Sequence, residues 1–124
     1  MKPVRFSRRV HNRYGRPHEH GEMTKVEVKY ADELEILKRQ DEIVTWWFER
    51  FKFKLAGGCF YTPDFGVFLL DGTIEFIDVK GTGPVDDKSI VKAKMAAELF
   101  FPFPFSILQE IPKKAGGGWK KRTF

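Results

Sequence analysis

Apolar residues near positions 24–40 recur at the spacing of one helical face. Four of them form a single stripe that we expect to be buried: Val26, Tyr30, Leu34 and Leu37. Thr24 stands before this stripe, and Glu27 follows three positions later, which is the arrangement of a capping box. The pattern therefore predicts an amphipathic helix that begins after Thr24 and ends near Gln40.

The pattern then changes to that of extended chain. Residues 43–55 begin with an apolar run and continue with alternating aromatic and lysine positions, the two-residue period of a strand with one wet face. After Gly57-Gly58, two further apolar runs at 60–70 and 73–80 flank the turn dipeptide Asp71-Gly72. These segments predict three strands, of which the last two form a hairpin.

A second helix and a last strand complete the predicted core. Asp86 or Asp87 caps a helix over residues 87–100, which Pro102 and Pro104 end, and residues 105–109 form a strand. Three apolar residues lie on one side of this helix: Val91, Met95 and Leu99. The order of elements is helix, three strands, helix, strand. We therefore expect a single α/β domain with a mixed central sheet flanked by helices.

Composition agrees with one folded unit. The chain has 124 residues, of which 42% are hydrophobic, enough for a substantial core. Its single cysteine, Cys59, excludes an internal disulfide framework and suits a reducing compartment. Neither a signal peptide nor an apolar segment of membrane-spanning length is visible. These features predict a cytoplasmic protein without membrane contact.

Positive charge is concentrated at the two ends of the chain. Residues 1–20 carry six Lys or Arg against one Glu, and residues 113–124 carry five against none, so each segment has a net charge of +5. Because the whole chain is also +5, the intervening residues 21–112 sum to −5. We expect a basic irregular arm (1–22), a central domain (23–112) and a loose basic tail (113–124). Basic segments of this kind favour binding to DNA or RNA.

The predicted hairpin carries charge where its strands are most apolar. Asp64 follows Pro63 in the first strand, and Asp78 and Lys80 share one face of the second. A bend at Pro63 would let Asp64 lean toward Asp78. Two converging carboxylates are costly unless a positive group lies between them, and Lys80 or a divalent cation such as Mg²⁺ would supply it.

These residues resemble a known signature. Pro63-Asp64, followed after thirteen residues by Asp78-Val79-Lys80, resembles the motif of the PD-(D/E)XK nuclease superfamily. The order of elements is similar to that superfamily's αβββαβ core, the restriction-endonuclease-like fold. The segments TKVEVKYADELEIL, YTPDFGVF, DGTIEFIDVKG and KAKMAAELF resemble short phage and prophage nucleases related to phage endonuclease I, a Holliday-junction resolvase. The resemblance covers roughly residues 24–110.

The resemblance implies a metal-dependent DNA endonuclease that acts on phage DNA in the bacterial cytoplasm. Asp64, Asp78 and the backbone carbonyl of Val79 would hold Mg²⁺ or Mn²⁺, and Lys80 would contact the scissile phosphate or the attacking water. The superfamily often adds a Glu from the first helix. Glu27 best matches that position among the candidates in this helix, although it also completes the capping box.

The first-helix alternatives to Glu27 are Glu33 and Glu35. The substrate also stays open, since a branched-DNA resolvase, a less selective endonuclease and an inactive nucleic-acid-binding module all fit the sequence. A resolvase that cuts two strands symmetrically requires a homodimer. The aromatic run Trp46-Trp47-Phe48 would suit such an interface if it is exposed, and otherwise belongs to the core.

Overall fold

The computed structural model describes residues 22–124, so the basic arm expected over 1–22 lies outside the described residues except for Glu22. The elements follow in chain order: α2 (Lys25–Arg39), β1 (Ile43–Phe48), β2 (Phe53–Ala56), β3 (Cys59–Tyr61), β4 (Phe65–Leu69), β5 (Ile74–Lys80), α3 (Asp87–Leu99), β6 (Phe105–Glu110), the 3₁₀ turn η1 (Lys113–Ala115) and β7 (Trp119–Thr123). The predicted α/β class is confirmed.

Helix α2 begins and ends where its sequence predicts. The backbone N–H of Glu27 donates to Thr24 Oγ1 at 3.4 Å, and the backbone N–H of Thr24 donates to Glu27 Oε1 at 2.8 Å, which completes the capping box. Gln40 is the C-terminal cap. Leu34 is 1% exposed, and the other three residues of the predicted stripe pack against the same core.

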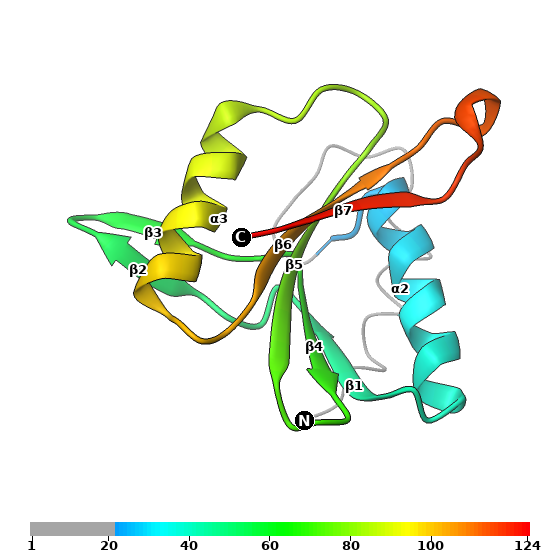
Figure 1. The fold of residues 1–124 in the computed structure, drawn as a ribbon, viewed down its shortest axis with the longest axis horizontal. Coiled ribbons are helices and arrows are strands. Elements are labelled where there is room, and N and C mark those ends of the chain that lie inside the picture. The colour runs from blue at the N-terminus through cyan, green and yellow to red at the C-terminus, as the bar shows by residue number, and fades with distance from the viewer. Residues whose placement is uncertain (1–21) are drawn as a thin grey trace.

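The main sheet is mixed and has the strand order β1-β4-β5-β6-β7. Its neighbours pair antiparallel except for β5 and β6, which run parallel. A parallel pair needs a crossover connection, and α3 provides it. Strands β2 and β3 form a separate two-stranded sheet. In Figure 1, the two helices lie on opposite sides of the main sheet, and β2 and β3 lie on the side of α3.

Each face of the sheet has its own apolar core. Under α2, the core is built from residues such as Leu34, Trp46, Phe65, Ile77 and Val79. Under α3 and the β2–β3 pair, it is built from residues such as Tyr61, Phe76, Ala93, Phe105 and Ile107. Strand β5 lies in the middle of the sheet and alternates between the two cores, as the two-residue period of a strand requires. Its even-numbered side chains, including Asp78, therefore face α3.

Two predicted strands are each broken in two. The run 43–55 divides into β1 and β2 because Glu49 has a φ of 47°, a left-handed conformation that turns the chain out of the sheet. The run 60–70 divides into β3 and β4 on either side of Pro63, which has no backbone N–H to donate to a ladder. The hairpin at Asp71-Gly72 forms as predicted, and Gly72 has a φ of 92°.

The C-terminal segment is not the loose tail that its composition predicted. Gly116, Gly117 and Gly118 all have positive φ and turn the chain back, so that β7 pairs antiparallel with β6 along its whole length. The backbone N–H of Phe124 donates to the carbonyl of Phe105 at 2.9 Å. The basic residues of this segment therefore have fixed positions on the sheet.

The exposure of the other apolar residues decides between the two interpretations of the aromatic run and differs from expectation on α3. Trp46, Trp47 and Phe48 are at most 9% exposed, so the core interpretation of this run holds and the exposed dimer surface does not. On α3, Val91 and Leu99 face outward, whereas Ala93 and Ala96 are fully buried because the helix lies close to the sheet. Within residues 22–124, neither helix combines the length and the apolar character that crossing a membrane requires.

Candidate functional site

The predicted acidic residues meet where the β4–β5 ladder ends. The last registered pair of this ladder is Phe65 with Ile77. Beyond it, Pro63 has no amide hydrogen and the backbone bonds of the ladder stop. Asp64 and Asp78 occupy this end, so the fold brings together the two carboxylates that the sequence singled out.

The two carboxylates form reciprocal hydrogen bonds with the opposite strand. The backbone N–H of Asp64 donates to Asp78 Oδ1 at 3.0 Å, and the backbone N–H of Val79 donates to Asp64 Oδ2 at 2.9 Å. Each carboxylate is thus tied to the backbone of the opposite strand just beyond the last registered pair. This arrangement fixes both carboxylates and leaves further lone pairs on their oxygens for another ligand.

The backbone of Asp64 is held from a second side. Its carbonyl accepts the backbone N–H of Glu49 at 2.8 Å, and Glu49 is the residue with left-handed φ at the end of β1. The break between β1 and β2 therefore also positions the acidic site. A left-handed conformation at a residue other than glycine is uncommon and is maintained only where surrounding contacts favour it.

Tyr61 is a buried partner of the site that the motif does not include. Its hydroxyl donates to Asp78 Oδ2 at 2.8 Å, and the residue is 5% exposed. Burial first, and then the negative charge of Asp78, raise the pKa of Tyr61 far above its ordinary value, so the hydroxyl stays protonated and remains a donor. Tyr61 lies three residues before Asp64, at the end of β3, and its aromatic character in an apolar run indicated only core packing.

Both carboxyl groups titrate above their ordinary range. Burial is the main cause for Asp64, and the neighbouring charges of Asp78 and Glu27 raise its pKa further. Burial also raises the pKa of Asp78, although the hydrogen bond from Tyr61 and the charge of Lys80 act in the opposite direction. The fold therefore maintains two acids whose ionised forms are destabilised by one another and by burial. A bound cation would relieve this cost.

Of the three helix glutamates considered, Glu27 lies closest to the acids. It is 5% exposed, and its side chain is within hydrogen-bonding reach of Asp64. Glu33 Oε2 instead accepts the indole N–H of Trp119 at 2.7 Å, and Glu35 Oε1 accepts that of Trp46 at 2.8 Å. These two glutamates therefore accept hydrogen bonds from tryptophan side chains. The sequence pattern of the helix did not indicate these contacts.

Lys80 lies beside Asp78 at the end of β5. Its side chain is partly exposed, and its positive charge lowers the pKa of both Asp78 and the exposed Asp86. The positive charge of Lys80 therefore acts both on the buried Asp78 and on Asp86 at the start of α3. A protonated lysine in this position can contact an anionic group that approaches the carboxylates.

The donor set is suited to a hard cation but is small. Among the described residues, no group of three or more His, Cys, Asp or Glu side chains is arranged to hold a metal ion. Mg²⁺, however, is commonly held by only one or two carboxylates, with substrate phosphate and water completing its octahedron. Asp64 and Asp78 fit that mode. The roles of Glu27 and of the Val79 carbonyl as additional ligands stay predictions.

Tyr61→Phe tests the hydrogen bond to Asp78. Removal of the hydroxyl leaves a buried carboxylate with one donor fewer, so we expect a loss of about 1–3 kcal/mol in the free energy of unfolding. Because that hydrogen bond lowers the pKa of Asp78, the pKa should rise in the variant. Urea denaturation measures the first effect, and titration of the Asp78 carboxyl carbon by NMR measures the second. An unchanged Asp78 titration would contradict this role of Tyr61.

Two substitutions at Glu27 separate its capping role from a role at the acids. Glu27→Gln retains a side-chain oxygen for the Thr24 amide, whereas Glu27→Ala removes this acceptor and should cost about 1 kcal/mol. If Glu27 serves the metal or its water, we expect Gln to reduce cleavage of DNA by about 10–100-fold without loss of stability. Thermal unfolding and single-turnover cleavage give the two readouts. Full cleavage by Glu27→Gln would restrict Glu27 to capping.

Comparisons of the chain with protein-family models, with curated proteins and with solved structures found no match.

Proposed function

We propose that this protein is a metal-dependent DNA endonuclease of the PD-(D/E)XK type, which hydrolyses phosphodiester bonds. The observation that carries the proposal is the pair Asp64 and Asp78, two carboxylates held side by side by reciprocal amide bonds, with Lys80 next to them. Burying two acids together lowers stability in the absence of a counterion. Two acids that a sheet holds together at a cost in stability are typical of a functional site.

In this proposal Asp64 and Asp78 hold Mg²⁺ or Mn²⁺, with Glu27 and the Val79 carbonyl as additional ligands. When bound there, the ion would supply an activated water and would stabilise charge on the phosphate. Tyr61 orients Asp78 through its hydroxyl, and this hydrogen bond favours the ionised form of the carboxyl. Lys80, next to Asp78 on the same strand, would stabilise the developing negative charge and position the water rather than act as a general base.

The substrate we propose is DNA, with branched DNA such as a Holliday junction as the preferred form and phage DNA processing in the bacterial cytoplasm as the setting. The basic character of the chain, with a sequence pI of about 9.4, supports a polyanionic partner. Cutting a junction symmetrically would require two copies of the chain.

Cleavage assays on three substrates test this proposal. A labelled four-way junction, a linear duplex and a single strand are each incubated with the full chain in Mg²⁺, in Mn²⁺ and in EDTA. We expect metal-dependent nicking, strongest on the junction. Equal cutting of the junction and the duplex would indicate a less selective endonuclease. Binding without cleavage in any metal would contradict the enzyme and indicate a nucleic-acid-binding module.

A further inference from the structure

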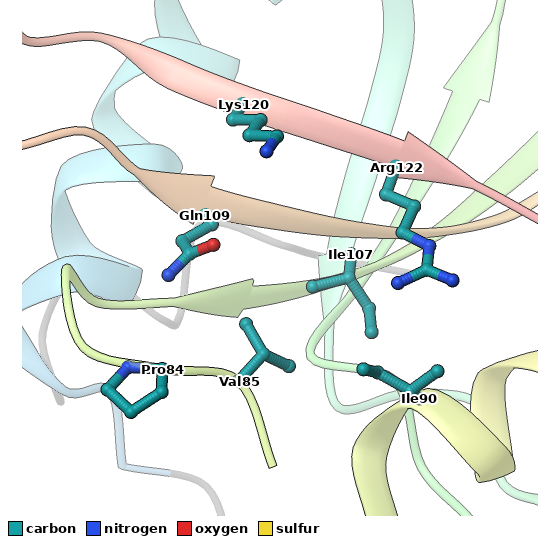
Figure 2. A pocket seen from close by; sticks show the side chains of 7 residues that line it. All are labelled: Pro84, Val85, Ile90, Ile107, Gln109, Lys120 and Arg122. Carbon is teal, nitrogen blue, oxygen red and sulfur yellow. The ribbon is translucent and has the colours of Figure 1, made fainter. Parts of the chain in front are cut away.

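A pocket of about 200 Å³ lies between strands β6 and β7 and the chain around the start of α3 (Figure 2). Its apolar wall is formed by four side chains: Pro84, Val85, Ile90 and Ile107. Its polar rim is formed by Gln109, Lys120 and Arg122. Figure 2 shows the two cationic side chains extending from β7 on the pocket side. The pocket thus combines positive charge with an apolar surface.

Strand register connects this pocket to the acidic site. Asp78 pairs with Ile107, which pairs with Arg122, and Lys80 pairs with Gln109, which pairs with Lys120. Registered residues on neighbouring strands point to the same face of a sheet, here the face of α3. With strands about 4.8 Å apart, the backbone of Arg122 lies about 10 Å from that of Asp78, and the backbone of Lys120 lies as far from that of Lys80. One nucleic-acid strand can cover both places.

Two side chains of the pocket rim, Gln109 and Arg122, are held in place by contacts with residues that do not line the pocket. Gln109 Nε2 donates to the carbonyl of Gly83 at 2.5 Å, which ties the loop before α3 to β6. The Arg122 guanidinium lies 5.0 Å from the centre of the Phe124 ring, a cation–π contact that restricts the side chain. Lys121, between the two rim cations, faces the opposite side of the sheet and pairs with Glu75 at 2.6 Å. No carboxylate is among the described residues that line the pocket.

We propose that this pocket binds the nucleotide next to the scissile phosphate, with its phosphate on Lys120 and Arg122 and its sugar and base against the apolar wall. The inference rests on the proposed function, because it requires the scissile phosphodiester to lie at the acidic site beside the pocket. Two cations without a carboxylate suit a phosphate, and the adjacent wall of Val85, Ile90 and Ile107 suits the less polar part of a nucleotide.

Titration with thymidine monophosphate tests the pocket without requiring cleavage. We expect the methyl NMR signals of Ile90 and Ile107 to shift on addition of the nucleotide, and inorganic phosphate to shift them much less. The double variant Lys120→Gln/Arg122→Gln should weaken nucleotide binding at least about tenfold. The matched control Lys113→Gln/Lys114→Gln removes the same charge from exposed residues of the turn before β7 and should bind as the wild type does. Two results would contradict nucleotide binding at this pocket. One is methyl signals that do not shift at high nucleotide concentration, and the other is an equal loss of nucleotide affinity in both double variants.

The salt dependence of DNA binding provides an independent measure. Loss of the one phosphate that Lys120 and Arg122 share should reduce the magnitude of the slope of log K against log[salt] by about 0.7–0.9 in Lys120→Gln/Arg122→Gln and by clearly less in the control. An unchanged slope would overturn the inference. Failure of the proposed function is distinguishable from failure of the pocket proposal. If only the proposed function fails, the protein still binds the nucleotide but cuts no DNA. Conversely, normal cutting by Lys120→Gln/Arg122→Gln would overturn the pocket and leave the nuclease intact.

Discussion

Replacement of Asp78 by Asn is expected to reduce metal-dependent DNA cleavage by at least about 10²-fold and to leave DNA binding nearly unchanged. Asn retains the size of the side chain and an oxygen for the Asp64 amide, but it lacks the charge that would hold a cation. Lys80 and the basic residues of β7 are unaltered in this variant, so the proposed contacts with DNA should persist. Single-turnover cleavage in Mg²⁺ and fluorescence anisotropy in EDTA measure the two properties separately.

Glu75→Gln is the matched control for this experiment. Glu75 is also a buried acid of β5, but it faces α2, where Ser106 donates to Glu75 Oε2 at 2.9 Å and Lys121 pairs with it. Its neutralisation removes one buried charge from the same strand without touching the candidate site. We expect cleavage to continue in Glu75→Gln. Normal cleavage by Asp78→Asn, or equal loss in both variants, would show that the acids have been assigned wrongly.

Asp64→Asn is expected to raise the melting temperature at pH 8 by about 4 °C while it abolishes cleavage. The substitution removes a buried charge that Asp78 and Glu27 both repel, and Asn still offers an oxygen to the Val79 amide. A gain of about 1 kcal/mol corresponds to a shift of several degrees in a domain of this size. Differential scanning calorimetry without divalent metal gives the value directly. A melting temperature below that of the wild type would contradict the unfavourable character of the Asp64 charge.

The raised pKa of Asp64 also determines how its contribution to stability depends on pH. Because the folded-state pKa of Asp64 lies above its unfolded value, the folded protein binds more protons than the unfolded chain between those two values. The contribution of Asp64 to stability is therefore favourable at low pH and is lost as pH rises through the folded pKa, at up to about 1.4 kcal/mol per pH unit. The difference in stability between Asp64→Asn and the wild type should consequently grow from pH 4 to pH 8.

Addition of Mn²⁺ should reverse this penalty. An ion that binds only the folded, ionised site stabilises it by mass action, so the wild type should gain melting temperature at pH 8 and Asp64→Asn should not. Glu75→Gln, with its site acids intact, should respond like the wild type. An equal response of the wild type and Asp64→Asn to Mn²⁺ would place any bound ion elsewhere on the chain.

Elements with local sequence signals were predictable. The capping box of α2 and the Asp71-Gly72 hairpin depend on residues a few positions apart, and both form as predicted. Strand β7 was not predictable in this way. Its five residues are mostly charged and follow three glycines, so the pattern lacks an apolar alternation, and the strand forms because the edge of β6 is available for pairing.

The acidic pair was predictable for a related reason. Asp64 and Asp78 are unusual within apolar strands. The hairpin between them brings them near one another, and this contact depends on local pairing alone. Tyr61 and the pocket cations depend on distant partners. The contact of Tyr61 with Asp78 requires the break at Pro63, and the placement of Lys120 and Arg122 requires the β6–β7 pairing. No local pattern encodes these distant pairings.

The reciprocal bonds at the end of the β4–β5 ladder provide two built-in reporters. The amide protons of Asp64 and Val79 each point at one of the two carboxylates. Their chemical shifts and exchange rates should respond when either acid gains a proton or a metal ion. Two resonances in the ¹⁵N–¹H spectrum of the uniformly labelled protein would thus follow the electrostatic state of the centre in real time, without a chemical probe attached at the site and before any substrate is known.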